Sequence, residues 1–285
     1  MKHLEVNRQK YHMQGFTTDG TYMYWSFTNT LVKTTMTGTV VAQKEVPITS
    51  EHLGGIDYHN GRIYGAAMGN SLKGDPWGEW TSFTVHVYDA ESLSLVKVIR
   101  LDDCYRDHAA CRDGFDGVGA ICAGVDAETG EEALFVGAAM RNGAEITGQI
   151  VLQYSLDGKL QKRHFVPTGA VNIGVQNIDF DPDTHCFWLT TYDPTEAYHV
   201  RETLFCASPD LKTVVKKYAF STPYGFHCCG GGRFYASLQY GKNGARGGFA
   251  YAADEALFAE INENPQRGSA INAYVMPRFD AEPGL

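Results

Sequence analysis

The chain has 285 residues, of which 44% are apolar and 20% charged, and it carries a formal net charge of -9 at pH 7. This acidic balance with scattered lysines and arginines argues against nucleic-acid binding, because phosphate recognition needs clustered basic side chains. No stretch approaches the roughly eighteen apolar residues of a membrane span, and the first six residues lack the apolar core of a signal peptide. We therefore expect a single-domain cytoplasmic protein with no nucleic-acid or membrane partner.

A strand pattern recurs five times along the chain, and each copy is a short strand, a polar turn and a second strand. The copies begin at Gly15 (GFTTDGTYMYWSF), Gly55 (GIDYHNGRIYGAA), Gly124 (GVDAETGEEALFVGA), Asn177 (NIDFDPDTHCFWLTT) and Phe226 (FHCCGGGRFYASL). Repeats with this spacing predict an all-β fold, a five-bladed β-propeller with four strands per blade. The five blades are expected at about residues 14–48, 52–101, 118–167, 172–220 and 223–254.

The fifth blade lacks an obvious outermost strand. The N-terminal segment HLEVNRQKYHMQG has the same form as TVVKKYAFSTPYG, an outer strand followed by the start of the next blade. We predict that residues 3–10 close the ring by pairing with the fifth blade, which removes an open sheet edge. Residues 255–285 would then form an appended helix and tail, and the alternative is closure by the C-terminal segment INAYVMPRF.

Loop lengths differ between the two faces of the predicted disk. Turns between first and second strands are short, as at Asp19-Gly20 and Asn60-Gly61, and so are those between third and fourth strands. Long connections occur between second and third strands and between blades, and in an up-and-down blade these lie on one face. A ligand pocket at the axis is therefore expected on this long-loop face.

Two long segments carry most of the chemistry expected there. The loop GNSLKGDPWGEWTSF of the second blade brings Trp77, Glu79 and Trp80 together, and indole faces beside carboxylates suit a sugar ring. The alternative is a loop folded on its own tryptophans.

The connection DDCYRDHAACRDGFDGVGA is the second segment. Arg106 and Arg112 are candidates to hold a ligand carboxylate, and Asp107, His108 and Asp116 are candidate proton-transfer residues. The alternative is a solvated run of charges that pair with each other.

Polar residues also recur where blades begin, and these are candidate substrate-binding residues. Histidine at such a place could act as a base, a metal ligand or a hydrogen-bonding group. No local metal motif is present, so no cofactor is expected, and an axial metal ion is retained as an alternative. The candidates at the start of blades are Gln14, His52, Gln176, Asn177 and His227. Two residues of later loops, Tyr192 and Gln239, are added to them.

An aspartate follows the apolar residue in three copies of the repeat, at Asp57, Asp126 and Asp179. A residue repeated between blades is expected to bind backbone N–H groups in each of them rather than to act in catalysis.

The opening MQGFTTDGTYMYWSF resembles the T-Q-G-L opening, followed by L-Y-E-S, of plant- and bacterial-type glutaminyl cyclases. The segment HVYDAESLSLVKVIRL is similar to the Y-D-A-x-T-L strand pair of that family. The resemblance implies a five-bladed propeller but not the activity, because Trp25 stands where the family has its first-blade acid and Gly54 where its F-G-E-G-L motif has glutamate. The whole chain most resembles bacterial propellers without an assigned activity.

These features lead to three hypotheses for the function. The first is a carbohydrate-active enzyme, a glycosidase or lyase that acts on a small, acidic glycoside in the axial pocket. The second is a propeller without catalytic activity that binds a ligand or a protein. The third is a transferase related to glutaminyl cyclase. An enzyme is expected to show at least one strongly perturbed carboxylate or histidine in its pocket, and a binding protein is not.

Overall fold

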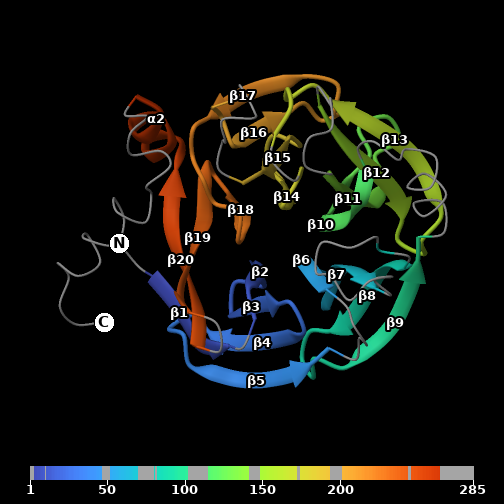
Figure 1. Cartoon of the computed structure of the whole chain (residues 1–285). Helices are drawn as coiled ribbons and strands as arrows, with labels where there is room; N and C mark the ends of the chain where they lie inside the picture. The colour runs from blue at the N-terminus through green and yellow to red at the C-terminus, as the bar shows by residue number, and fades with distance from the viewer. Residues whose placement is uncertain are drawn as a thin grey trace.

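The computed structural model describes residues 3–9, 11–46, 52–69, 80, 82–101, 115–140, 148–171, 174–192, 201–242 and 245–263. Five four-stranded antiparallel sheets are arranged in a ring (Figure 1), so the chain is a five-bladed β-propeller as predicted. Within these ranges no helix has the length and apolar character needed to cross a bilayer.

In each of the first four blades the strands follow one another from the axis to the rim. In blade 1 they are β2 Met13–Thr18, β3 Tyr22–Phe27, β4 Thr30–Thr35 and β5 Val40–Glu45. In blade 2 they are β6 His52–His59, β7 Arg62–Gly69, β8 Ser82–Asp89 and β9 Leu95–Arg100. In blade 3 they are β10 Phe115–Val125, β11 Glu132–Met140, β12 Gln149–Ser155 and β13 Leu160–Val166. In blade 4 they are β14 Asn177–Phe180, β15 Phe187–Thr190, β16 Leu204–Ala207 and β17 Val214–Tyr218.

Blade 5 takes strands from both ends of the chain. Its order is β18 Phe226–Gly230, β19 Arg233–Lys242, β20 Ala245–Asp254 and then β1 His3–Gln9. The antiparallel register places Val6 opposite Gly248 and Gln9 opposite Arg246. The predicted closure by the N-terminal strand is confirmed, and the alternative segment INAYVMPRF lies outside the described residues. The helix expected after Asp254 is α2, Glu255–Glu263.

Buried apolar side chains of the described residues form five clusters, and each lies between two neighbouring blades. Met13 and Trp25 of blade 1 meet Ala250 of blade 5 in one of them. Phe258 of α2 joins the cluster between blades 4 and 5 and is fully buried, with its ring 4.5 Å from that of Phe220. Each blade therefore buries its faces against its two neighbours.

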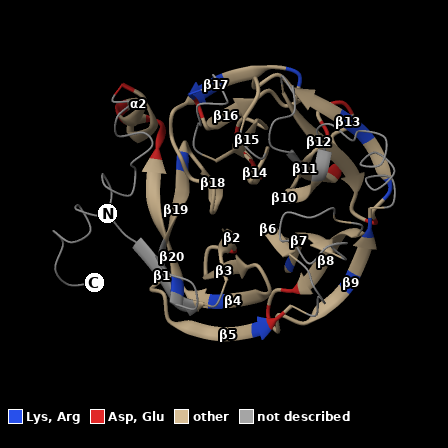
Figure 2. Cartoon of the chain, in the orientation of Figure 1, with Lys and Arg blue, Asp and Glu red and all other residues tan. Residues whose placement is uncertain are grey.

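Lysines and arginines lie mainly along the outer strands of the ring (Figure 2). At the axis the inner strands approach each other closely. A Cβ atom on Gly54 would lie 2.4 Å from the backbone oxygen of Gly119, and one on Gly15 would lie 2.9 Å from Cα of Gly55. Because real Cβ contacts are longer than this, glycine allows neighbouring inner strands to pack backbone against backbone.

Candidate functional site

One residue of each inner strand occupies the same place at the axis. The strand register shows this equivalence, because each of these residues lies opposite the aromatic residue at the same point of the second strand. The opposed pairs are Thr17 and Tyr24, Asp57 and Tyr64, Cys122 and Phe135, Asp179 and Trp188, and His227 and Tyr235. We call these five residues, Thr17, Asp57, Cys122, Asp179 and His227, the axial ring.

The predicted equivalence of Asp126 with Asp57 and Asp179 is wrong. The inner strand β10 runs to Val125, and the blade 3 residue in the axial ring is Cys122, four positions before Asp126. Asp126 instead begins the following turn, where its Oδ1 accepts hydrogen bonds from the N–H groups of Glu128 at 2.8 Å and Thr129 at 3.0 Å. Its other oxygen accepts a hydrogen bond from Lys162 at 2.8 Å, and this ion pair holds the pKa of Asp126 below its ordinary range despite desolvation.

Hydrogen bonds between blades hold the axial carboxylates in place. Oδ1 of Asp57 accepts from the Thr17 hydroxyl at 3.1 Å and its Oδ2 from the N–H of Ala123 at 2.8 Å, so this carboxylate touches blades 1 and 3. Oδ2 of Asp179 accepts from the N–H of Cys228 in blade 5 at 2.9 Å. The prediction that these two aspartates bind backbone N–H groups is confirmed, and the groups belong to the next blade.

His227 completes the axial ring beside Asp179. Its Nδ1 lies 3.0 Å from Oδ2 of Asp179, but this nitrogen forms no hydrogen bond of good geometry to a described residue. Burial lowers the pKa of His227, and the charges of Asp179 and Asp57 outweigh that effect, so the net shift is upward.

For Asp57 the main effect is burial, which disfavours the charged form of its carboxylate. Desolvation raises the pKa of Asp57 well above its ordinary range, and the charge of Asp179 raises it further, while His227 opposes both effects. Two buried carboxylates and one imidazole thus share the axis. Asp57 and Asp179 are each only 6% exposed, and His227 alone of the three lines an open groove.

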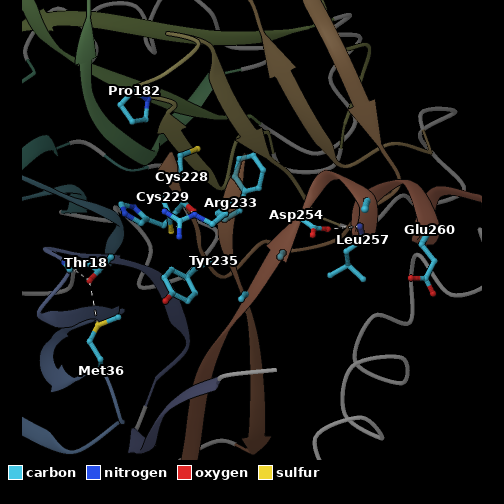
Figure 3. A pocket seen from close by; sticks show the side chains of 16 residues that line it. Thr18, Met36, Pro182, Cys228, Cys229, Arg233, Tyr235, Asp254, Leu257 and Glu260 are labelled. Carbon is cyan, nitrogen blue, oxygen red and sulfur yellow. Dashed lines mark hydrogen bonds between the residues drawn. The ribbon is translucent and has the colours of Figure 1, made fainter. Parts of the chain in front are cut away.

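The groove over His227 has a volume of about 990 Å³ and lies on the face of the short turns. Its lining comes from the strand ends that share that face, those of β2, β4, β14 and β20, from β18 and β19 around their turn, and from α2. Figure 3 shows Cys229, Arg233 and Tyr235 near one end and Asp254, Leu257 and Glu260 near the other. We call this cavity the short-turn groove.

The turn beneath Arg233 depends on three glycines. Gly230, Gly231 and Gly232 all have positive φ, at 73°, 62° and 67°, a conformation that other residues rarely adopt. The N–H of Gly231 donates a hydrogen bond to Asp183 of blade 4, which fixes the turn to its neighbour. The glycines therefore set the position from which Arg233 projects.

The cysteines beside the groove are poor nucleophiles. Burial raises the pKa of Cys229 to about 11, and it also raises the pKa of Cys228. Because the thiolate is the reactive form, neither thiol is activated at neutral pH.

The long-loop face holds the other candidates that the structure describes. Gln239 accepts a hydrogen bond from the N–H of Met13 at 2.8 Å, and Asn177 donates one to the carbonyl of Pro223 at 2.8 Å. Gln14 donates to the Thr28 hydroxyl at 3.3 Å. Each of these amides holds neighbouring segments together.

Aromatic candidates on the same face are largely buried. Burial lowers the pKa of His52 to about 4, and its ring lies 6.3 Å from that of Trp80. Burial also raises the pKa of Tyr192 to about 12, and the tyrosine packs edge-on against Tyr224. Gln176 is half-buried at the start of β14. The structure therefore brings none of these residues to the axial ring.

Trp77, Glu79, Arg106, Asp107, His108 and Arg112 lie outside the described residues, and their roles stay predictions. Asp116 lies on β10, and its side chain is not described. His227 is the one predicted site residue that joins the axial ring.

Sequence reasoning missed Asp57 and Asp179 because it treated a repeated aspartate as structural. A signal was available: the aligned position carries Thr17, Asp57, Asp179 and His227, which differ in chemistry between blades. Cys122 had no such signal, because the extra length of β10 shifts blade 3 out of the apparent alignment.

Comparison with known proteins supports the fold. No family model and no curated protein matches the chain. The crystal structure of Myxococcus xanthus glutaminyl cyclase is similar, with a TM-score of 0.54, 12% identity, and coverage of 89% of this chain and 95% of that one. A computationally designed protein, Ika4, matches with a TM-score of 0.37, 10% identity, and coverage of 67% and 92%. The WD40 domain of Neurospora crassa Pan2 matches with a TM-score of 0.41, 8% identity, and coverage of 84% and 74%. At this identity the likeness to glutaminyl cyclase shows the propeller fold alone.

Proposed function

We propose that this propeller binds a small organic anion in the short-turn groove. The observation that carries the proposal is a groove of about 990 Å³ into which Arg233, Tyr235 and His227 project. Sites for small molecules usually have this size and combine an apolar lining with a few polar groups that orient the ligand.

The polar end of the short-turn groove suits a carboxylate or phosphate. The Arg233 side chain is exposed, and its Nε contacts the carbonyl of Gly230 at 3.5 Å, within its own turn. Guanidinium groups bind planar anions through two parallel hydrogen bonds, and the Tyr235 hydroxyl and the His227 ring offer further donors beside it.

The other walls suit an apolar body. Met36 of the β4–β5 turn, Phe234 of β19 and Leu257 of α2 line the groove. The carboxylate of Asp254, near this end, is already bound, since its Oδ1 accepts a hydrogen bond from the N–H of Leu257 at 2.9 Å and caps α2. The ligand that fits is therefore amphipathic, with its anionic group toward the axis and its apolar part toward α2.

Calorimetry with a panel of small carboxylates and phosphates tests the proposal, with uronic-acid and neutral oligosaccharides included. Arg233→Gln should weaken binding of the best anion about tenfold or more, because it removes a charged hydrogen-bond donor. The control is Lys159→Gln, which makes the same change of charge in the short turn between β12 and β13. If the two variants weaken binding equally, or no member of the panel binds, the proposal is wrong.

The same panel is scored for turnover, which tests the earlier hypotheses of a glycosidase or lyase. A peptide with N-terminal glutamine is added for the glutaminyl-cyclase hypothesis. If turnover is retained in Arg233→Gln but lost in Asp107→Asn, the active site lies on the long-loop face, where those hypotheses placed it.

A further inference from the structure

We propose that Asp57, Asp179 and His227 bind one divalent transition-metal ion at the axis of the propeller. One donor atom from each of these three side chains, which come from β6, β14 and β18, lies within 4.8 Å of the other two. Bonds of about 2.0–2.2 Å from Zn²⁺ to oxygen or nitrogen put donor atoms up to about 4 Å apart, so movements of less than about 1 Å complete the site. The site shares His227 with the short-turn groove, but metal binding at the axis does not require an anion in that groove.

The carboxylates are held as metal ligands usually are. Thr17 and the N–H of Ala123 bind Asp57, and the N–H groups of Phe180 and Cys228 bind the two oxygens of Asp179 at 2.7 and 2.9 Å. A carboxylate oxygen has two lone pairs, so each oxygen that accepts one hydrogen bond keeps a lone pair for a metal. Such outer contacts orient ligands and make a site rigid.

His227 supplies an observation independent of the acidic pair. Its Nδ1 is buried and lies 3.0 Å from Oδ2 of Asp179, the distance of an ion pair, but the contact does not have the angle of a well-formed hydrogen bond. A buried ring nitrogen whose hydrogen bond is poorly aligned is only partly satisfied. Coordination of a metal would satisfy it, and the short contact with Oδ2 is a normal separation for two ligands of one ion.

The charge of the cluster also favours a cation. Asp57 and Asp179 are both buried, with an oxygen of each within 4.8 Å of the other, and His227 is the one basic side chain in the cluster. Burying two like charges with at most one opposite charge is unfavourable unless a cation compensates. One nitrogen and two oxygen donors suit Zn²⁺ or Mn²⁺.

The test uses the full chain after removal of metal with a chelator and dialysis. Calorimetric titration with Zn²⁺ and, separately, Mn²⁺ should show one saturable site per chain, and saturating metal should raise the unfolding temperature. Asp57→Asn and His227→Gln should each weaken binding by tenfold or more. Asp126→Asn is the matched control, because it removes an equally buried aspartate that is paired with Lys162 and lies outside the cluster. This variant should bind the metal as tightly as the wild type does.

A spectroscopic measurement keeps the test decisive if a variant folds poorly. Co²⁺ added to the wild-type chain should give the visible absorption of an ion with protein ligands, and His227→Gln should change that spectrum. Absence of a saturable site in the wild type would overturn the proposal, and so would binding or a spectrum that stays unchanged in the folded variants.

Discussion

At the residue scale, identical side chains serve different purposes according to their place in the blade. Asp57 and Asp179 join blades at the axis, whereas Asp126 caps its own turn. Histidines divide in the same way. His227 lies among carboxylates, and His52 and His86 lie among apolar groups, where burial lowers the pKa of each to about 4.

His86 makes stability depend on pH. Its ring is 5% exposed and contacts the Tyr88 hydroxyl at 3.1 Å. Because its folded pKa of about 4 lies below the unfolded value of 6.5, the native chain binds fewer protons, so stability present above pH 6.5 is lost as the pH falls toward 4. His86→Gln should reduce the loss of unfolding free energy between pH 7 and pH 5 by on the order of 1 kcal/mol, measured by urea denaturation. Equal losses in the wild type and in His86→Gln would contradict the prediction.

Gly54 tests how tightly the inner strands pack. Gly54→Ala places a Cβ against a backbone oxygen that has no flexible side chain to move, and it should cost about 2 kcal/mol or more of unfolding free energy. Gly20→Ala is the comparison, since Gly20 has φ of 82° and open space around it. The only cost of this substitution is the unfavourable backbone conformation of the alanine. Chemical denaturation should therefore rank Gly54→Ala as the more harmful, and the reverse order would show that the axis can relax.

At the scale of the element, β1 and α2 complete a blade that its own consecutive strands leave unfinished. The N-terminal strand β1 covers the edge of β20, and α2 covers the apolar side of the blade 4 and 5 cluster with Phe258. Both devices remove surface that would otherwise favour association.

Deletion of residues 1–10 should therefore expose the edge of β20. We expect a lower unfolding temperature and association that increases with protein concentration, measured by calorimetry and light scattering. A synthetic peptide of residues 1–11 added in trans should restore the monomer-like behaviour, because an added strand can pair with the free edge of β20 through its backbone. A truncated chain that is as stable and dispersed as the full one would contradict this role of β1.

At the scale of the whole molecule, each blade depends on two neighbours because the apolar clusters lie between blades. Trp25 is buried between blades 1 and 5, and Trp188 between blades 4 and 5. In a closed ring the loss of one blade exposes two interfaces, which favours unfolding as a single unit.

Two variants that each retain one tryptophan, Trp25 or Trp188, should consequently report the same denaturation midpoint by fluorescence. The other tryptophans are replaced by phenylalanine, and far-ultraviolet circular dichroism of the same samples corrects for any general loss of stability. Midpoints that differ after this correction would show that the blades unfold separately.

Much of the architecture could be predicted because strands, turns and their repetition are local properties. Alternating apolar residues and turn glycines indicated the five blades, and the likeness between the N-terminal segment and an outer strand indicated the closure. The axial ring could not be read in the same way. The place of Cys122 depends on how far β10 extends before its turn, and the short-turn groove depends on where α2 lies after β20.

The sequence by itself predicted a five-bladed propeller and favoured closure by the N-terminal strand, since hydrophobic periodicity and turn chemistry specify each strand from neighbours in the chain. Only the tertiary structure decided that Asp57, Asp179 and His227 meet, because they are far apart in sequence and come together through the closure of the ring. It also decided that the groove lies on the short-turn face, since that cavity is built from strand ends and a helix whose positions depend on long-range packing.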